Sequence, residues 1–114
     1  MPLFSDSIRA RLLANGVHAA RGQILDPVPV VKLFTPDANA TWLLTELDPN
    51  DPDRAFGLCD LGLGLPELGH VSLTELEALR GPTGLAIEQD AHFRPDRPLS
   101  AYADAAKATG RITA

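Results

Sequence analysis

The sequence has little of what small secreted proteins and membrane-spanning proteins depend on. Among its 114 residues there is one cysteine, so no disulfide can form within the chain. A single thiol suits a reducing compartment. No apolar run approaches the roughly 20 residues that span a bilayer, and the first residues lack the basic and apolar regions of a signal peptide. We therefore expect a cytoplasmic protein without a membrane segment.

Aromatic side chains are also scarce, at 5% of the chain, whereas hydrophobic residues make up 45%. A core must therefore consist mainly of leucine, valine, isoleucine and alanine. The length suits one domain, and a chain of this size buries about two thirds of the surface that its unfolded form exposes. Because there is no internal repeat, low-complexity tract or linker, we expect residues 1–114 to form a single α+β domain.

Positive charge is missing from the middle of the chain. The formal net charge is −5, but residues 33–79 carry nine acidic side chains against one base, Arg54, which gives that segment a charge of −8. Nucleic-acid binding gains from Lys and Arg that displace counterions from phosphates. The acidic middle therefore disfavours nucleic acid as a partner, while a basic protein partner or a cation is compatible with it.

Three helices are predicted, and they cover residues 5–14, 73–80 and 99–109. The first has an apolar stripe at helical spacing, and Asn15 with Gly16 supplies a C-terminal cap. The second begins with Ser72 and Glu75 at the spacing of a capping box, in which each side chain satisfies the backbone N–H of the other residue. The third should end before Gly110.

Five strands are predicted, and they cover residues 28–34, 41–47, 54–61, 68–71 and 85–93. The first two should pair antiparallel across a turn, while Gly62 and Gly64 mark a bend after the third. The last strand alternates apolar and polar residues. Without regular alternation of strands and helices, this order predicts a small, mostly antiparallel sheet of about four to five strands, with about three helices on one face or end.

The most chemically suggestive pattern lies in the last predicted strand. Glu88, Asp90 and His92 alternate, so on a regular strand they share one face and can hold a divalent metal or share acid–base work. Glu46 or Asp60 from neighbouring strands would complete a metal cluster. The competing interpretation is the solvated face of a half-buried strand.

Three further side chains carry alternative interpretations. Trp42 is either an exposed binding anchor or a structural residue of the core. Arg80 either donates to the last carbonyls of the preceding helix or pairs with Glu88 or Asp90 across the turn. Cys59 shares a strand face with apolar residues, and no nearby feature activates its thiol, so it is assigned to the core rather than to nucleophilic catalysis.

A set of short motifs extends over residues 28–102: Lys32-Leu33-Phe34-Thr35-Pro36-Asp37, Trp42, Thr45-Glu46, Phe56-Gly57-Leu58, Pro66 to Leu73, Glu75-Leu76, Arg80-Gly81-Pro82, Gly84-Leu85, Ile87-Glu88, Asp90, Phe93 and Pro98-Leu99-Ser100. With these motifs the chain resembles a bacterial family of small proteins of unknown function, often carried on plasmids and integrated conjugative elements. The resemblance implies a mobile-element setting, and it implies no established activity, catalytic set or cofactor. His70 and His92 depart from it, since an aromatic such as Tyr is expected there.

The sequence favours a non-enzymatic accessory or interaction protein that acts through an acidic surface on a protein partner, because it contains no recognisable catalytic constellation. The candidate binding residues are Glu46, Asp60, Glu88, Asp90, Trp42 and Arg80. The alternative is a small metal-dependent enzyme that uses the acidic face of strand 85–93. No cofactor is predicted, and the sequence leaves open the oligomeric state and any enzymatic activity.

Overall fold

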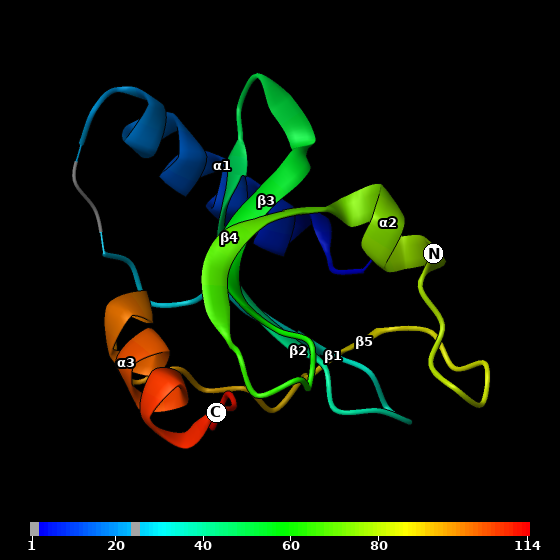
Figure 1. The fold of residues 1–114 in the computed structure, drawn as a ribbon. Helices are drawn as coiled ribbons and strands as arrows, with labels where there is room; N and C mark the ends of the chain where they lie inside the picture. The colour runs from blue at the N-terminus through cyan, green and yellow to red at the C-terminus, as the bar shows by residue number, and fades with distance from the viewer. Residues whose placement is uncertain (1–2, 24–25) are drawn as a thin grey trace.

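The computed structural model describes residues 3–23 and 26–114, and it contains a five-stranded sheet and three helices (Figure 1). In chain order the elements are α1 (Asp6–Ala20), β1 (Val31–Phe34), β2 (Thr41–Asp48), β3 (Asp51–Asp60), β4 (Glu67–Ser72), α2 (Leu73–Ala78), β5 (Glu88–Gln89) and α3 (Leu99–Thr109). This confirms the predicted α+β class. No helix in the described part of the chain is both long enough and apolar enough to cross a membrane.

The strands lie in the order β4-β3-β2-β1-β5, and every pairing is antiparallel. The predicted pairing of the first two strands is confirmed, with Val31 opposite Leu44 and Phe34 opposite Thr41. The first strand begins at Val31 rather than at residue 28, because the buried Pro29 has no N–H to donate to a ladder. In the strand order of the sheet, β2 is central, and β4 and β5 form the two edges.

A β-bulge at Thr45 decides which face of the sheet each residue of β2 occupies. Leu44 lies opposite Gly57, but the next pair is Glu46 with Phe56, so Thr45 is an extra residue. Its hydroxyl donates to the Phe56 carbonyl at 3.3 Å. Because the bulge shifts the alternation by one residue, Leu47 lies in the same core as Leu44, and Glu46 is turned to the opposite face.

Both faces of the sheet carry a hydrophobic core, which corrects the expectation that the helices lie on one face or end. On one face, α1 and α2 contribute Leu12, Leu73 and Leu76 to a core that contains Trp42 and Leu44. On the other face, α3 packs on residues that alternate with these, in a core made of Leu43, Leu58, Leu99, Tyr102 and Ala106. In Figure 1, α1 and α2 lie at the upper part of the sheet and α3 at its lower left.

The first helix continues past its predicted end. Asn15 and Gly16 do not cap it, and α1 extends to Ala20, with Gly22 taking the left-handed conformation (φ 79°) after it. Both residues are used for packing instead. The Asn15 side-chain amide donates to the Thr45 carbonyl at 2.8 Å, and the buried Gly16 lies directly against the β2 backbone. Tertiary contacts therefore override the local stop signal.

The second and third helices are confirmed, apart from the C-terminal end of α2. Ser72 caps α2, since its hydroxyl accepts from the Glu75 N–H at 3.2 Å. The reciprocal half of the predicted capping box is absent among the described residues, because the Glu75 side chain accepts no hydrogen bond from the Ser72 N–H, and the helix ends at Ala78 rather than at residue 80. α3 runs from Leu99 to Thr109, and Gly110 follows it with a φ of 79°. Tyr102 is buried, as its place on the predicted helix required.

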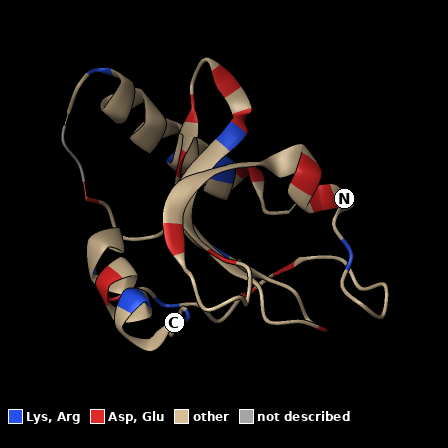
Figure 2. Ribbon diagram, viewed as in Figure 1, with Lys and Arg blue, Asp and Glu red and all other residues tan. Residues whose placement is uncertain are grey.

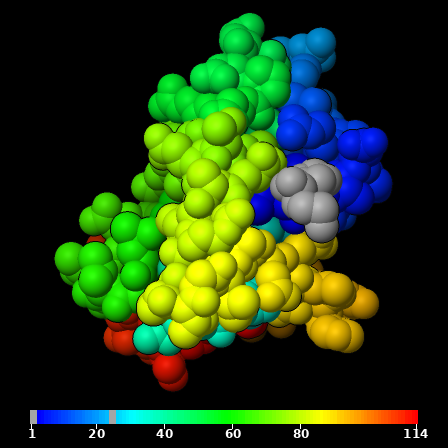
Figure 3. Space-filling model, turned by 90° about the vertical axis from the view of Figure 1, so that its right-hand side faces the viewer, coloured from blue at the N-terminus to red at the C-terminus, as the bar shows by residue number. Residues whose placement is uncertain are grey.

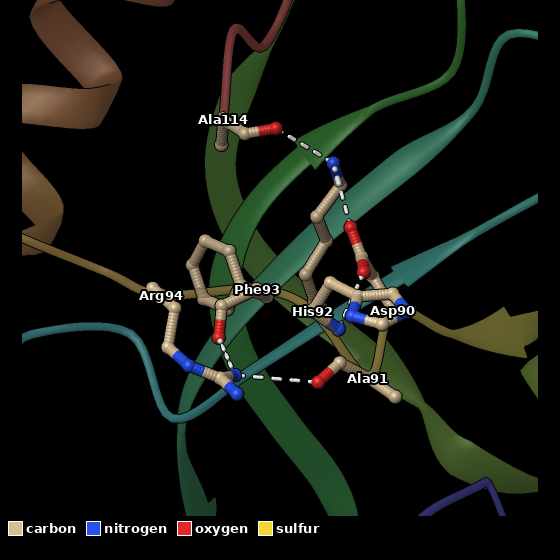
Figure 4. Close-up of polar contacts among 7 residues, drawn as sticks. Asp90, Ala91, His92, Phe93, Arg94 and Ala114 are labelled. Carbon is tan, nitrogen blue, oxygen red and sulfur yellow. Dashed lines mark hydrogen bonds and ion pairs between the residues drawn. The ribbon is translucent and has the colours of Figure 1, made fainter.

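The predicted strand over residues 85–93 is wrong for most of its length. Within residues 85–93, only Glu88 and Gln89 of β5 pair with β1, while Ala86 forms an isolated bridge with Arg80. After β5, Asp90 turns the chain, because its carboxylate accepts from the His92 N–H at 2.9 Å (Figure 4). Polar alternation in this segment therefore reflects a short strand followed by a turn, and not a half-buried strand.

Candidate functional site

Several acids of the chain's middle hold the backbone together and are not part of a free acidic surface. Asp53 in β3 accepts from the Ser72 hydroxyl and from both the N–H and the hydroxyl of Thr74, at 2.6–2.8 Å. These hydrogen bonds, that of the Ser72 hydroxyl first, lower the pKa of Asp53. The carboxylate thus joins β3 to the first turn of α2.

Asp37 makes an equivalent connection between the β1–β2 turn and the segment after α2. The N–H and the hydroxyl of Thr83 both donate to Asp37 Oδ2, and the Thr83 side chain is the main cause of the lowered pKa of Asp37. Gly81 lies so close that a Cβ there would be 1.7 Å from Asp37 Oδ1. Figure 3 shows the yellow segment after α2 lying against the teal β1–β2 turn. Two of the motifs that carry the resemblance, the one that ends in Asp37 and Arg80-Gly81-Pro82, therefore have a structural role.

The predicted metal residues do not form one cluster. Asp60 is buried and accepts from the N–H groups of Gly62 and Ile112 at 2.8 and 2.9 Å. Glu46 lies five residues along β2 from the partner of Asp60, which places the two roughly 15 Å apart. Across residues 3–23 and 26–114, no group of three or more His, Cys, Asp or Glu side chains can hold a metal ion.

Asp60 and Asp90 do border one hollow of about 570 Å³ at the end of the sheet, together with Lys32. Lys32 Nζ lies 3.4 Å from Asp90 Oδ2 and donates to the Ala114 carbonyl at 2.7 Å (Figure 4). Hydrogen bonding to the His92 N–H and then to Lys32 lowers the pKa of Asp90. Both carboxylates thus have protein partners already, while Glu88 is exposed on β5 and is not part of this hollow.

Trp42 and Arg80 take the structural roles that the sequence left as alternatives. Trp42 is only 2% exposed and packs in the core with Leu44, so it is no exposed anchor. Arg80 Nη1 donates to the Glu77 and Leu79 carbonyls at 2.9 Å each. Trp42 therefore belongs to the core, and Arg80 binds the last carbonyls of the preceding helix.

Glu46 has an unusual environment among the predicted residues. The bulge places it beside Phe56 in β3, which in turn lies beside His70 in β4 with ring centroids 5.0 Å apart. This row borders a hollow of about 380 Å³ that also includes the α1 residue Gly16. Burial, and then the charge of Asp48, raises the pKa of Glu46, while burial and Arg54 lower the pKa of His70. One strand separates the two groups, so their backbones lie roughly 10 Å apart.

Among the described residues, the most exposed apolar side chains are leucines that the sequence did not single out as a site. Leu61, Leu63, Leu65 and Leu68 are 61%, 77%, 75% and 49% exposed. They belong to the β3–β4 connection and the start of β4, and we call them the leucine loop. Gly62 and Gly64 both have φ near 80°, a conformation that L side chains disfavour, so the predicted bend is confirmed. The sequence does contain a signal of this feature, because Leu61, Leu63 and Leu65 alternate with the two glycines of the predicted bend.

Two open hollows lie beside β4, one on each face of the sheet. The first, of about 470 Å³, has an apolar floor of Leu61, Val71, Leu76 and Leu79. The second, of about 550 Å³, contains Leu58, Leu65 and Leu68 together with Ala103 of α3. Val71 and Leu68 are three residues apart on one strand, so their side chains point to opposite faces. Apolar surface therefore lies beside β4 on both faces of the sheet.

Acidic side chains without partners border both hollows. The side-chain carboxylates of five acids of the chain's middle accept no hydrogen bond and form no ion pair with any described residue: Glu46, Asp51, Glu67, Glu75 and Glu77. Figure 2 shows acidic residues in red at the β2–β3 hairpin and on α2. Asp51 and Glu75 border the first hollow and Glu67 the second, while Arg54 and Lys107 are the Lys or Arg residues that border them. We call Asp51, Glu67, Glu75 and Glu77 the acidic surface.

Comparison with known families gives one match. The family model described as "Protein of unknown function (DUF2958)" matches residues 3–113. The chain belongs to this family. The resemblance to a family of unknown function is thereby confirmed over almost the whole chain. No match was found among curated proteins or among solved structures.

Proposed function

We propose that this DUF2958 protein is a non-enzymatic accessory protein that binds a basic protein partner through the acidic surface. The observation that carries the proposal is that Asp51, Glu67 and Glu75 are exposed, have no partner among the described residues, and border apolar hollows. Apolar area with a charged rim is the usual composition of a protein interface. The setting on mobile elements that the resemblance implied suits an accessory role.

The acidic surface favours a basic partner electrostatically. Like charges that have no internal partner repel one another, and a basic partner relieves that repulsion on binding. Charged rims mainly accelerate association and select the partner, so binding should weaken as salt increases. A partner that itself binds nucleic acid would carry a suitable basic surface, and this protein would then compete with the nucleic acid.

The alternative of a metal-dependent enzyme has no geometric support among the described residues. Asp90 is paired with Lys32, and residues 88–92 form a two-residue strand followed by a turn and not a continuous strand face. Thermal unfolding with Mg²⁺, Mn²⁺, Zn²⁺ or Ca²⁺ tests this alternative, since an ion that binds only the native state raises the melting temperature. A rise that disappears in Glu88→Ala plus Asp90→Ala would restore the enzyme hypothesis.

The proposal is tested by affinity capture from the native host at low salt, followed by binding measurements with each purified candidate. The informative variant is Asp51→Asn with Glu75→Gln and Glu77→Gln. The control is Asp6→Asn with Glu88→Gln and Asp96→Asn, which removes the same charge from exposed positions outside the acidic surface and outside both hollows. We expect a basic protein whose Kd rises at least tenfold with the first variant and less than twofold with the control. No candidate partner, or equal effects of the two variants, contradicts the proposal.

A further inference from the structure

The outer edge of β4 is an unprotected sheet edge. β4 is six residues long, and in the described part of the chain no strand pairs with its outer side. Natural edge strands are usually blocked by proline, by lysine, by a bulge or by great shortness. β4 contains none of these, and its titratable side chains are Glu67 and His70 alone. The other edge, β5, has only two residues and offers little to pair with.

The two hollows adjoin β4, one on each face of the sheet, so they are open to side chains of a strand added beside β4. Side chains of an added strand alternate between the faces of the sheet. On one face they would meet Val71, Leu76 and Leu79, and on the other Leu58 and Leu68. An occupant that also covered the leucine loop would remove exposed leucine surface from water, which favours binding. Main-chain hydrogen bonds and apolar contacts thus favour the same occupant.

Charge specifies the chemistry of that occupant. Glu67 lies at the start of β4 and borders the second hollow. Asp51 and Glu75 border the first hollow, which also contains Ser72, the last residue of β4. An added strand would therefore have acidic side chains near both of its ends and apolar floors between them. A second copy of this chain would instead bring together two molecules of net charge −5 at this edge.

We propose that the β4 edge and the leucine loop bind an extended, apolar, β-prone segment of a partner protein, flanked by Lys or Arg at both ends, which adds to the sheet as a sixth strand. This mode of recognition draws its affinity from the main chain and its selectivity from the alternate side chains. The inference rests on the proposed function, because it specifies how the basic partner is held.

The test uses a synthetic peptide of about ten residues, in which alternating valine and threonine are flanked by two lysines at each end. Two controls are the same peptide N-methylated at alternate amides, and its counterpart with glutamate in place of lysine. On the protein, Leu68→Lys is compared with Leu85→Lys, since the two leucines are 49% and 48% exposed and only Leu68 lies on the edge. Binding is measured by titration, and amide hydrogen exchange is followed over residues 67–72.

We expect the lysine peptide to bind and to slow amide exchange in β4, while N-methylation, glutamate replacement and Leu68→Lys each weaken binding at least tenfold. Leu85→Lys should change binding less than twofold. If the N-methylated peptide binds equally well and only the acidic-surface variant weakens binding, strand addition is wrong and the proposed function stands. If the protein forms a dimer that Leu68→Lys disrupts and no peptide binds, the edge is occupied by a second copy and the inference is overturned. If no peptide binds and a basic partner is nevertheless captured, the partner does not use this edge.

Discussion

Gly16 in α1 and Leu47 in β2 approach so closely that a Cβ on Gly16 would lie 1.7 Å from the Leu47 carbonyl oxygen. β1 pairs with β2 only as far as Leu44, so the same side of β2 is without a strand partner beyond that point. α1 lies there instead, and Asn15 satisfies the Thr45 carbonyl. The helix thus covers one stretch of open sheet edge, while β4 keeps its own edge free.

The first prediction concerns Gly16→Ala. Helix propensity alone would make this change stabilising by about 1 kcal/mol. The clash with a backbone atom cannot be relieved by a side-chain rotation, and overpacking of this kind costs about 1–3 kcal/mol or more. We expect the clash to exceed the propensity gain, so that urea unfolding shows a lower free energy of unfolding than in the wild type.

Ala14→Gly is the matched control, because Ala14 is exposed on the same helix. It should lower the free energy of unfolding by about 1 kcal/mol through propensity alone. A stabilised Gly16→Ala variant beside a destabilised Ala14→Gly variant would show that α1 does not pack on β2 as described.

Local rules predicted the elements whose causes are local. Ser72 and Glu75 lie within one helical turn, so the capping of α2 was visible in the sequence. The C-terminal end of α1 was not, because Gly16 follows Asn15 in a cap-like pair and only contact with Leu47 explains its place inside the helix. The predicted strand over residues 85–93 was wrong for a related reason, since the length of β5 depends on how far β1 extends beside it.

The candidate site was harder to predict than the fold. Which strand becomes an edge depends on pairings between distant segments, so the exposure of β4 cannot be read from its own six residues. The count of acids also overestimated the free acidic surface. Asp37, Asp53 and Asp60 accept hydrogen bonds from residues between 2 and 52 positions away, and nothing in the local sequence distinguishes them from Asp51.

The second prediction concerns the pH dependence of stability that Asp53 causes. The Ser72 and Thr74 donors lower its folded-state pKa. A lowered carboxyl pKa stabilises the fold at pH values above the unfolded pKa, about 3.9, and this contribution is lost as the pH falls through the folded pKa. Asp53→Asn should therefore be less stable than the wild type at pH 7, and the difference should shrink below pH 4.

Asp51→Asn is the control, because Asp51 is exposed and accepts no hydrogen bond from a described residue. Its urea midpoint should stay close to that of the wild type from pH 7 to pH 3. A gap between Asp53→Asn and the wild type that keeps its size down to pH 3 would mean that the Asp53 carboxylate is not the group responsible.

The third prediction concerns the reactivity of Cys59. The thiol packs against the core, and burial raises its pKa to about 11. At pH 8 only about one thiol in a thousand is then ionised, whereas about a quarter is ionised at an ordinary pKa near 8.5. We expect a disulfide reagent to modify native Cys59 at least a hundredfold more slowly than the urea-unfolded chain. A native rate like that of free cysteine would reopen the question of a nucleophilic role.

The fourth prediction concerns Glu46, whose pKa is shifted in the direction opposite to that of Asp53. Burial, and then the charge of Asp48, raises its pKa. A raised carboxyl pKa destabilises the fold at neutral pH, and this cost disappears as the pH falls below the unfolded value of about 4.3. Glu46→Gln should therefore unfold at higher urea concentration than the wild type at pH 7 and at the same concentration near pH 3. Asp48→Asn should give a smaller gain, because it removes only the second cause of the shift. If Glu46→Gln is instead less stable than the wild type at pH 7, the Glu46 carboxylate has a favourable partner that the bulge at Thr45 does not reveal, and the hollow beside His70 becomes the better candidate site.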